Sequence, residues 1–208
     1  MDYAAARKVM VDSQVRVNDV TDRALQAALL DTPRERLCAP DQAYVAYAEV
    51  APVIVGDRRL MQAREIGKLL QGCDARPGER ALAIAAPYAA AVLARMGLEV
   101  TAQDTEAALA VVAQGLDASK VEHVAAPLER PIGGDWDLIV SEGAVAQRPT
   151  AWLQALAPGG RLAVVERPGR VGKAVLYMRG RDGFSRKELF DASATVLSEL
   201  TPAPTFAL

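Results

Sequence analysis

Short apolar segments alternate with helical patterns from Arg80 to Glu166, and this alternation restricts the possible folds more than any other feature of the chain. The predicted strands are 81–85, 98–103, 121–125, 136–141 and 161–166, and the predicted helices between them are 88–96, 105–116 and 149–157. Short strands separated by helices require parallel crossovers in one sheet that is covered on both faces. We therefore predict an α/β fold with a Rossmann-like sheet.

Regions of different periodicity flank this alternating part. Apolar residues recur at helical spacing before it, with Asp19 as the expected N-cap of a second helix and a third helix expected over 60–71. After it, the segments 173–179 and 184–190 are separated by a glycine-containing turn, which predicts an antiparallel hairpin at the end of the sheet.

These patterns predict two regions that pack as one compact unit. Residues 1–78 form an N-terminal helical extension on the sheet, and residues 79–208 form the Rossmann-like domain. The chain has 208 residues, of which 51% are hydrophobic, so it has enough apolar side chains for a substantial core.

The charge distribution argues against a nucleic-acid partner, because the formal net charge is −2. Residues 161–190 are locally basic, with eight basic and three acidic side chains. This stretch is either the solvated face of an edge hairpin or a docking surface for an acidic partner. The longest uncharged run, 81–94, contains Pro87 and is shorter than the roughly 20 residues that cross a bilayer. With no signal-peptide pattern at the N-terminus, we expect a cytoplasmic protein with no membrane span.

The first strand-to-helix turn of a Rossmann-like sheet is normally rich in glycine, because the backbone there adopts positive φ and approaches a ligand. Here that turn, Ile84–Tyr88, contains no glycine. A left-handed alanine costs about 1 to 2 kcal/mol, so we expect this loop to take another path, with Pro87 at the first helical position. The second strand ends at Asp104, which is either an acid that binds ribose hydroxyls or the N-cap of the next helix.

Five segments resemble the protein-L-isoaspartate (D-aspartate) O-methyltransferase family, and the similarity spans nearly the whole chain. They are Ser13–Asp22, Pro33–Glu35, Trp136–Val140, Gly143–Ala144 and Leu156–Leu162. The resemblance implies an S-adenosylmethionine methyltransferase fold with an N-terminal helical extension. It also implies an enzyme that methylates the carboxylate of isoaspartyl residues in damaged proteins.

The chain departs from the family's pattern where the family performs chemistry. Arg59–Ala63 match a Thr-Ile-Ser-x-Pro-like substrate segment, which makes Arg59, Met61 and Gln62 the substrate-side candidates although both hydroxyls and the proline are absent. Ala83 stands in place of an acid before the cofactor loop, and Ala126–Leu128 stand in place of a Gly-Asp-Gly-like turn.

Asp104 alone remains among the cofactor contacts that the resemblance implies, and Ala85, Ala86 and Tyr88 would lie beside a ligand if one still binds. Small apolar residues, among them Ala89 and Ala90, are expected to fill the cleft.

We therefore predict a non-catalytic pseudoenzyme that has lost S-adenosylmethionine binding, with no catalytic residue, no cofactor and no metal. It would act through its surface as an interaction or regulatory module for a protein partner. The alternative is an active S-adenosylmethionine-dependent protein carboxyl methyltransferase, and a third possibility is a site recruited for another small ligand such as a nucleotide.

Three further features have ordinary structural interpretations. His123 is expected to be structural rather than a general base, and the isolated Cys38 and Cys73 are expected to be reduced. Arg58 and Arg59 form either a surface pair near a helix start or a site that holds a carboxylate or phosphate.

Overall fold

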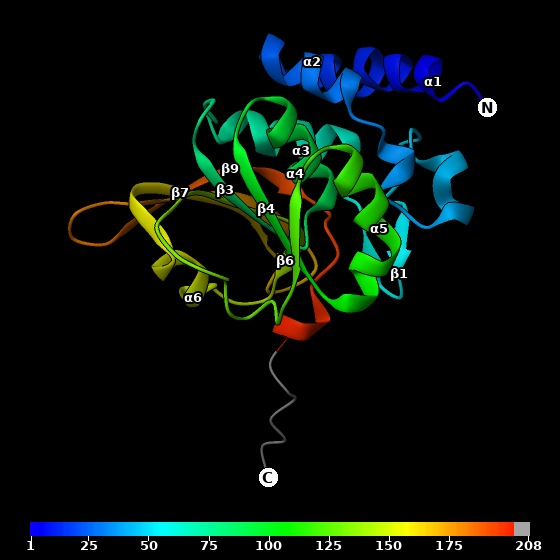
Figure 1. The fold of residues 1–208 in the computed structure, drawn as a ribbon. Helices are drawn as coiled ribbons and strands as arrows, with labels where there is room; N and C mark the ends of the chain where they lie inside the picture. The colour runs from blue at the N-terminus through cyan, green and yellow to red at the C-terminus, as the bar shows by residue number, and fades with distance from the viewer. Residues whose placement is uncertain (202–208) are drawn as a thin grey trace.

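A central seven-stranded sheet dominates the computed structural model, which describes residues 1–201 (Figure 1). The strands follow the order β5-β4-β3-β6-β7-β8-β9 across the sheet. Their bounds are β3 (Arg80–Ile84), β4 (Glu99–Asp104), β5 (Glu122–Ala125), β6 (Trp136–Val145), β7 (Leu156–Glu166), β8 (Gly172–Arg179) and β9 (Phe184–Ala192). Strands β3 to β7 run parallel to one another, whereas β8 is antiparallel to both β7 and β9. The predicted Rossmann-like sheet and the C-terminal hairpin are confirmed.

Six α-helices accompany the sheet in the described residues, together with short 3-10 and π-helical turns. They are α1 (Tyr3–Met10), α2 (Arg23–Asp31), α3 (Ala63–Gly72), α4 (Pro87–Arg95), α5 (Glu106–Ala118) and α6 (Thr150–Gln154). A small separate hairpin pairs β1 (Val53–Val55) with β2 (Arg58–Arg59). Figure 1 shows α1 and α2 at the opposite end of the molecule from the last described residues, which are drawn in red.

Alternate residues of β3 supply two hydrophobic clusters, because successive side chains of a strand point to opposite faces. Ala81 and Ala83 join the cluster that contains the buried residues of α2 to α5. Leu82 and Ile84 join a second cluster with Trp152 of α6. Both faces of the sheet are therefore covered, and strands that are buried on both faces read as continuous apolar runs.

The uncharged run 81–94 includes most of α4 and packs inside the chain. Every residue from Pro87 to Leu93 of α4 is buried, and this helix lies between the sheet and α2. Small side chains permit this close approach, which explains why a helix without a polar face is found here.

The N-terminal region differs from the sequence-based expectation at one cap. Asp22, not Asp19, is the N-cap of α2, because its carboxylate accepts hydrogen bonds from the Ala24 and Leu25 amides at 2.8 and 3.1 Å. Asp19 adopts a left-handed φ of +61° at the end of the preceding 3-10 turn. Asp tolerates this conformation better than most residues.

The sequence predicted two regions, 1–78 and 79–208. The division at residues 78 and 79 remains a prediction, and the last part of the second region, 202–208, lies outside the described residues. No helix in residues 1–201 is long and apolar enough to cross a membrane.

Candidate functional site

The strand order reverses between β3 and β6, and this switch point is where sheets of this kind bind ligands. The two strands pair up to Ile84 and Ser141, so the groups that follow them meet at one edge of the sheet. These groups are the turn Ala85–Ala86, the start of α4 and the second half of β6 from Glu142 onward.

The turn after β3 keeps a left-handed residue although it has no glycine. Ala85 has a φ of +51°, so the expectation that this loop takes another path is wrong. The Ala85 amide donates to the carbonyl of Gln103 at 2.9 Å, and its side chain is fully buried in the second cluster. Tertiary contacts therefore hold the conformation against its cost of about 1 to 2 kcal/mol.

Glu142 lies at the N-terminus of α4, which begins at Pro87 as predicted. Its Oε1 accepts hydrogen bonds from the amides of Tyr88 and Ala89 at 2.8 and 2.9 Å. Its Oε2 accepts one from the amide of Met61 at 3.1 Å. A helix N-terminus attracts anions through its free N–H groups and its dipole. Here the anion is a carboxylate of the chain itself.

Arg34 provides the positive charge near this buried carboxylate. Burial raises the pKa of Glu142, while Arg34 and the three amide hydrogen bonds lower it. Both side chains are only 1% exposed. The Arg34 guanidinium lies 4.7 Å from the centroid of the Tyr88 ring, and it donates to the carbonyls of Ala46 and Met61. The carboxylate of Glu142, the guanidinium of Arg34 and the ring of Tyr88 therefore form one buried cluster.

No pattern in the sequence distinguished Glu142 or gave Arg34 a role. The available signal was an acidic residue two positions after the apolar stretch Leu138–Val140 of a strand, at the end where ligands bind. A buried ionised carboxylate needs hydrogen-bond donors. In this chain they come from the start of α4, where Tyr88 lies 54 residues before Glu142 in the sequence.

Asp104 ends β4 but is not a helix cap. Thr105 is the N-cap of α5, since its hydroxyl accepts from the Ala108 amide at 3.3 Å, so the N-cap interpretation of Asp104 is wrong. Oδ1 of Asp104 accepts from the Thr105 amide at 2.8 Å and lies 3.2 Å from Nη2 of Arg58. Burial raises the pKa of Asp104 to about 6, while Arg58 lowers it.

Arg58 is a buried residue and not part of a surface pair. Its Nη2 also lies 2.8 Å from Oε1 of Glu199, so one guanidinium contacts two carboxylates. Arg59, in contrast, is exposed, and its Nη1 lies 3.4 Å from the carbonyl of Ala51. The two neighbours therefore serve different purposes because they point to opposite sides of the β1–β2 hairpin.

The candidate substrate residues Met61 and Gln62 follow this hairpin. Met61 is buried, and Gln62 is half-buried just before α3. They line a hollow of about 10 Å³ together with Arg59 and Glu142. A volume of about 10 to 15 Å³ holds one water molecule. The structure brings these candidates to one place, but the space between them is small.

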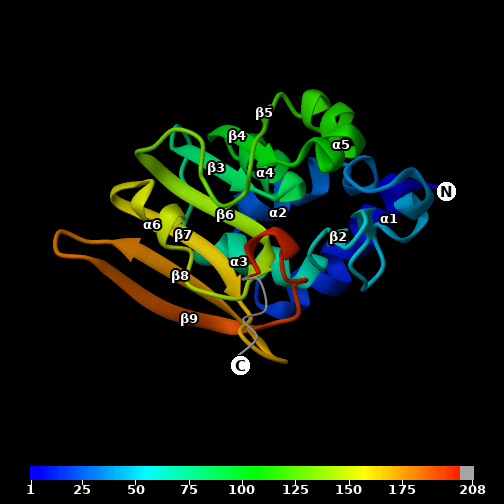
Figure 2. The ribbon, with the colours of Figure 1, turned by 90° about the horizontal axis from the view of Figure 1, so that it is seen from below.

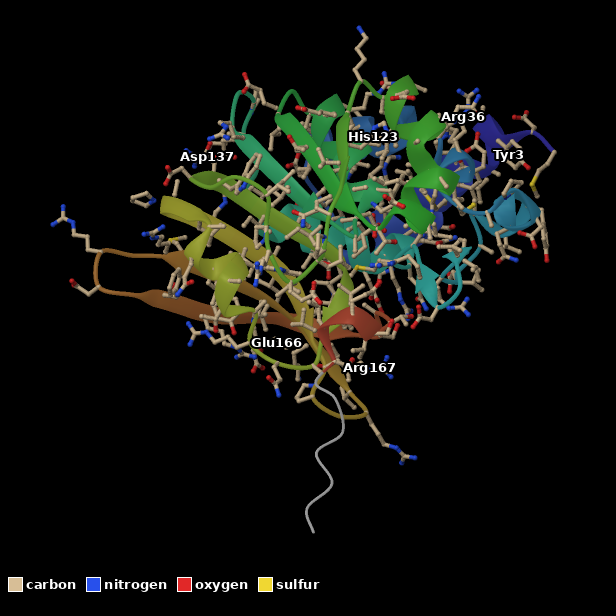
Figure 3. The ribbon with its side chains drawn as sticks, turned by 60° about the horizontal axis from the view of Figure 1, so that its bottom comes forward. Tyr3, Arg36, His123, Asp137, Glu166 and Arg167 are labelled. Carbon is tan, nitrogen blue, oxygen red and sulfur yellow. The ribbon has the colours of Figure 1, made fainter. Side chains whose placement is uncertain are left out.

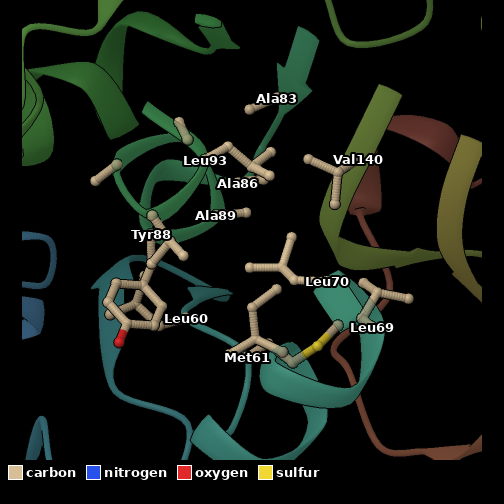
Figure 4. Packing of buried hydrophobic residues seen from close by; sticks show 14 of the residues in the cluster. Leu60, Met61, Leu69, Leu70, Ala83, Ala86, Tyr88, Ala89, Leu93 and Val140 are labelled. Carbon is tan, nitrogen blue, oxygen red and sulfur yellow. The ribbon is translucent and has the colours of Figure 1, made fainter. Parts of the chain in front are cut away.

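Apolar packing continues from this hollow to the start of α4. Figure 4 shows Leu60, Met61 and Leu70 facing Ala86, Ala89 and Tyr88 across the region where α3 and α4 approach each other. All of these side chains are at most 2% exposed.

His123, Cys38 and Cys73 lie among groups that hold the fold together. His123 lies half-buried on the edge strand β5, 3.7 Å from Asp117, and Figure 3 shows it far from Glu166 and Arg167. Cys38 and Cys73 are buried and unpaired, as expected. The described residues contain no cluster of metal-ligating side chains.

Three basic side chains of the stretch 161–190 form salt bridges with acidic side chains of the chain. Salt bridges join Arg161 to Glu79, Lys173 to Asp191, and Arg186 to both Glu166 and Glu188. The edge strand β9 thus carries charged pairs, which discourage pairing with another strand.

Relatives of known sequence share most of the length of this chain. A protein-L-isoaspartate O-methyltransferase of Methylorubrum extorquens is 33% identical over 196 residues, which are 90% of this chain and 86% of the relative. The chain belongs to the protein-L-isoaspartate O-methyltransferase family. A member from Methylorubrum populi is 31% identical over 192 residues, 88% of this chain and 91% of its own. No model of a known protein family matches the chain.

Solved structures of the protein-L-isoaspartate O-methyltransferase family have the same fold. A crystal structure from Plasmodium falciparum, described as such a methyltransferase in complex with S-adenosyl-L-homocysteine, has a TM-score of 0.78 with 13% identity. The match covers 96% of this chain and 99% of that one. The S-adenosylmethionine methyltransferase type of sheet, with an N-terminal helical part and C-terminal antiparallel strands, is therefore confirmed.

Proposed function

We propose that this family member does not perform ordinary methyl transfer and acts instead through its surface, as an interaction or regulatory module for a protein partner. The observation that carries the proposal is the carboxylate of Glu142 on the amides of Tyr88 and Ala89, where a helix start would otherwise receive a ligand.

The residues of the cleft do not fit S-adenosylmethionine. The acid at the end of the second strand would have to hold sugar hydroxyls, but Asp104 contacts Arg58 and is buried beneath it. The first turn would have to leave room for a nucleoside, but Ala85, Ala86 and Tyr88 are at most 2% exposed. Both positions that the fold offers to a ligand are engaged by groups of this chain.

Freeing these positions is energetically expensive. Withdrawing Glu142 leaves the buried amides of Met61, Tyr88 and Ala89 without their acceptor and removes the carboxylate whose charge acts on the buried Arg34 guanidinium. Leaving a buried donor without its acceptor costs about 1 to 3 kcal/mol, so each unpaired amide corresponds to a loss of about 5- to 150-fold in affinity for a ligand that must displace the carboxylate.

An active S-adenosylmethionine-dependent protein carboxyl methyltransferase is the second candidate. The specific observation in its favour is that relatives at 33% and 31% identity, over nearly the whole chain, carry the name protein-L-isoaspartate O-methyltransferase. On this candidate, Glu142 and Arg58 must move aside when the cofactor binds, and Arg59, Met61 and Gln62 lie on the substrate side. The relatives favour this candidate, whereas the geometry of the cleft favours the first.

Isothermal titration with S-adenosylmethionine, paired with transfer of a labelled methyl group to an isoaspartyl peptide, separates the two. We expect no binding tighter than about 100 μM, on a scale where 1 mM corresponds to about −4.1 kcal/mol, and no labelled ester. An active family member serves as the positive control. Tight binding would refute the loss of S-adenosylmethionine binding, and formation of the labelled ester would refute the first proposal and establish the second.

A further inference from the structure

The segment after β9 runs over the cleft rather than away from it. We call residues 193–201 the strap. The Ala144 amide of β6 donates to the carbonyl of Thr195 at 2.8 Å, and the Leu197 amide donates to the carbonyl of Ala144 at 2.8 Å. Val196 thus forms a single parallel bridge to Ala144. In Figure 2 the strap is the red segment between β2 and the end of β6.

Leu197 fixes the strap to the sheet by close packing. A Cβ atom built on Gly143 would lie 2.3 Å from Cδ2 of Leu197, so only glycine leaves room for this side chain. Leu197 is 4% exposed and belongs to the second hydrophobic cluster, with Val145 and Trp152.

Polar contacts hold both ends of the strap. At its start, Oε1 of the buried Glu65 accepts from the Ser193 amide at 3.1 Å and from the Ser193 hydroxyl at 2.8 Å. Arg167 donates to the carbonyl of Ala194 at 3.0 Å, close to the red turn in Figure 3. At its end, Glu199 pairs with Arg58, which in turn contacts Asp104.

The groups beneath the strap keep unused hydrogen-bonding capacity. Nη1 of Arg58, Oδ2 of Asp104 and Oε2 of Glu65 are buried and have no hydrogen-bond partner among the described residues. Unpaired buried polar atoms are uncommon in folded proteins. Two hollows of about 10 Å³ flank the strap, one beside Arg58 and Glu199 and one beside Glu65 and Glu142. The strap therefore covers polar groups that it does not fully satisfy.

We propose that residues 193–201 are a hinged cover of the switch-point cleft, which opens while the sheet stays folded and is held shut by the contact between Glu199 and Arg58. Opening exposes Asp104 and Arg58 to solvent, whereas Glu142 stays on the start of α4. Access to the cleft is controlled in this way whether or not the chain transfers methyl groups.

Amide hydrogen exchange followed residue by residue tests the hinge. The variant Glu199→Ala should raise the exchange rate of Ala144 and Leu197 by about fivefold or more, because one ion pair is lost, and leave the amides of β7 unchanged. The matched control is Glu122→Ala, which removes an exposed glutamate from the far edge strand β5. Unchanged exchange at Leu197 in the Glu199 variant, or an equal rise throughout the sheet, would overturn the proposal.

Carboxyl footprinting with a carbodiimide, read by mass spectrometry, tests what the strap covers. The variants Glu199→Ala and Gly143→Ala should label Asp104, with Gly143→Ala acting by expelling Leu197, while Glu142 stays unlabelled. The unmodified protein and the Glu122→Ala control should label neither residue. If Asp104 stays unlabelled in both opened variants, or if Glu142 reacts together with it, the strap is not a separate cover and the inference fails.

Discussion

Nη2 of Arg58 lies 3.2 Å from the carboxylate of Asp104, and the two side chains are 6% and 4% exposed. Arg58 comes from the small β1–β2 hairpin and Asp104 from the end of β4, so the contact joins the N-terminal region to the sheet. A third group, Glu199 of the strap, shares the same guanidinium. The acid that a nucleoside would need in this fold is thus part of a network within the chain.

A double-mutant cycle should show strong coupling between these two residues. Arg58→Met alone leaves Asp104 buried without its cation, whereas the double variant Arg58→Met/Asp104→Asn removes both charges. We expect a coupling energy of at least about 1 kcal/mol, measured from urea unfolding of the four proteins. Additive effects within about 0.5 kcal/mol would show that the contact contributes little.

Asp104 should make stability depend on pH in an unusual direction for a carboxylate. Its pKa is raised to about 6 in the folded chain, so the folded state binds a proton that the unfolded state releases between its usual pKa and 6. The stabilisation is full below the unfolded pKa and is lost as the pH rises through 6. The charged groups that face Asp104 are Arg58 and Glu199.

The measurement compares the unmodified protein with Asp104→Asn at two pH values, so that other titrating groups cancel. Between pH 7.5 and pH 5, the difference in unfolding free energy should move in favour of the unmodified protein by about 1 kcal/mol. A difference that stays constant, or moves the other way, would show that the folded-state pKa of Asp104 is not raised.

Removal of the Glu142 carboxylate should be among the most destabilising single changes in the chain. Glu142→Ala leaves the amides of Met61, Tyr88 and Ala89 unpaired, together with the charge of Arg34, and we expect a loss of about 3 to 5 kcal/mol. Added formate or acetate should restore part of the lost stability, because either anion can bind where the carboxylate stood at the start of α4.

Equilibrium unfolding of Glu142→Ala and of a control variant, with and without acetate, measures what the Glu142 carboxylate contributes to stability. The control Glu122→Ala should change stability by less than about 0.5 kcal/mol, as is usual for exposed positions. A loss below about 1 kcal/mol for Glu142→Ala, or an equal effect of acetate on both variants, would argue against an internal anion at this helix start.

Ala85 offers a test of the strained turn. Glycine at this position relieves a left-handed backbone but loses a buried methyl group, so Ala85→Gly should lie within about 1 kcal/mol of the unmodified protein. Ala83→Gly is the matched control, because Ala83 is equally buried in the regular strand β3. It should cost about 1 to 2 kcal/mol more than Ala85→Gly. Equal losses would show that no strain is stored at Ala85.

The sequence predicted the sheet well because strand and helix patterns are local. Each predicted strand lies within a few residues of an observed one, and Pro87 starts its helix where proline's fixed φ and missing N–H are tolerated. The apolar run around Ala85 and Ala90 also predicted a filled cleft, and these side chains are buried.

Contacts between segments that are distant in the sequence cannot be predicted from local strand and helix patterns. Nothing near Glu142 in the sequence indicates that its carboxylate caps α4, because the strand order alone places the end of β6 beside that helix. For the same reason the sequence left open whether Arg58 lies at the surface or holds a carboxylate, and its contact with Asp104 depends on where the fold places the hairpin. Ala85 follows the same rule, since a hydrogen bond to Gln103 fixes a conformation that alanine disfavours locally.

The chain by itself thus determined its layers, its hairpin and its family, because these depend on periodicity and on short local motifs. Only the tertiary structure decided which charges meet in the cleft. A buried carboxylate or guanidinium is tolerated only beside a partner, and that partner can come from any segment that the fold brings near.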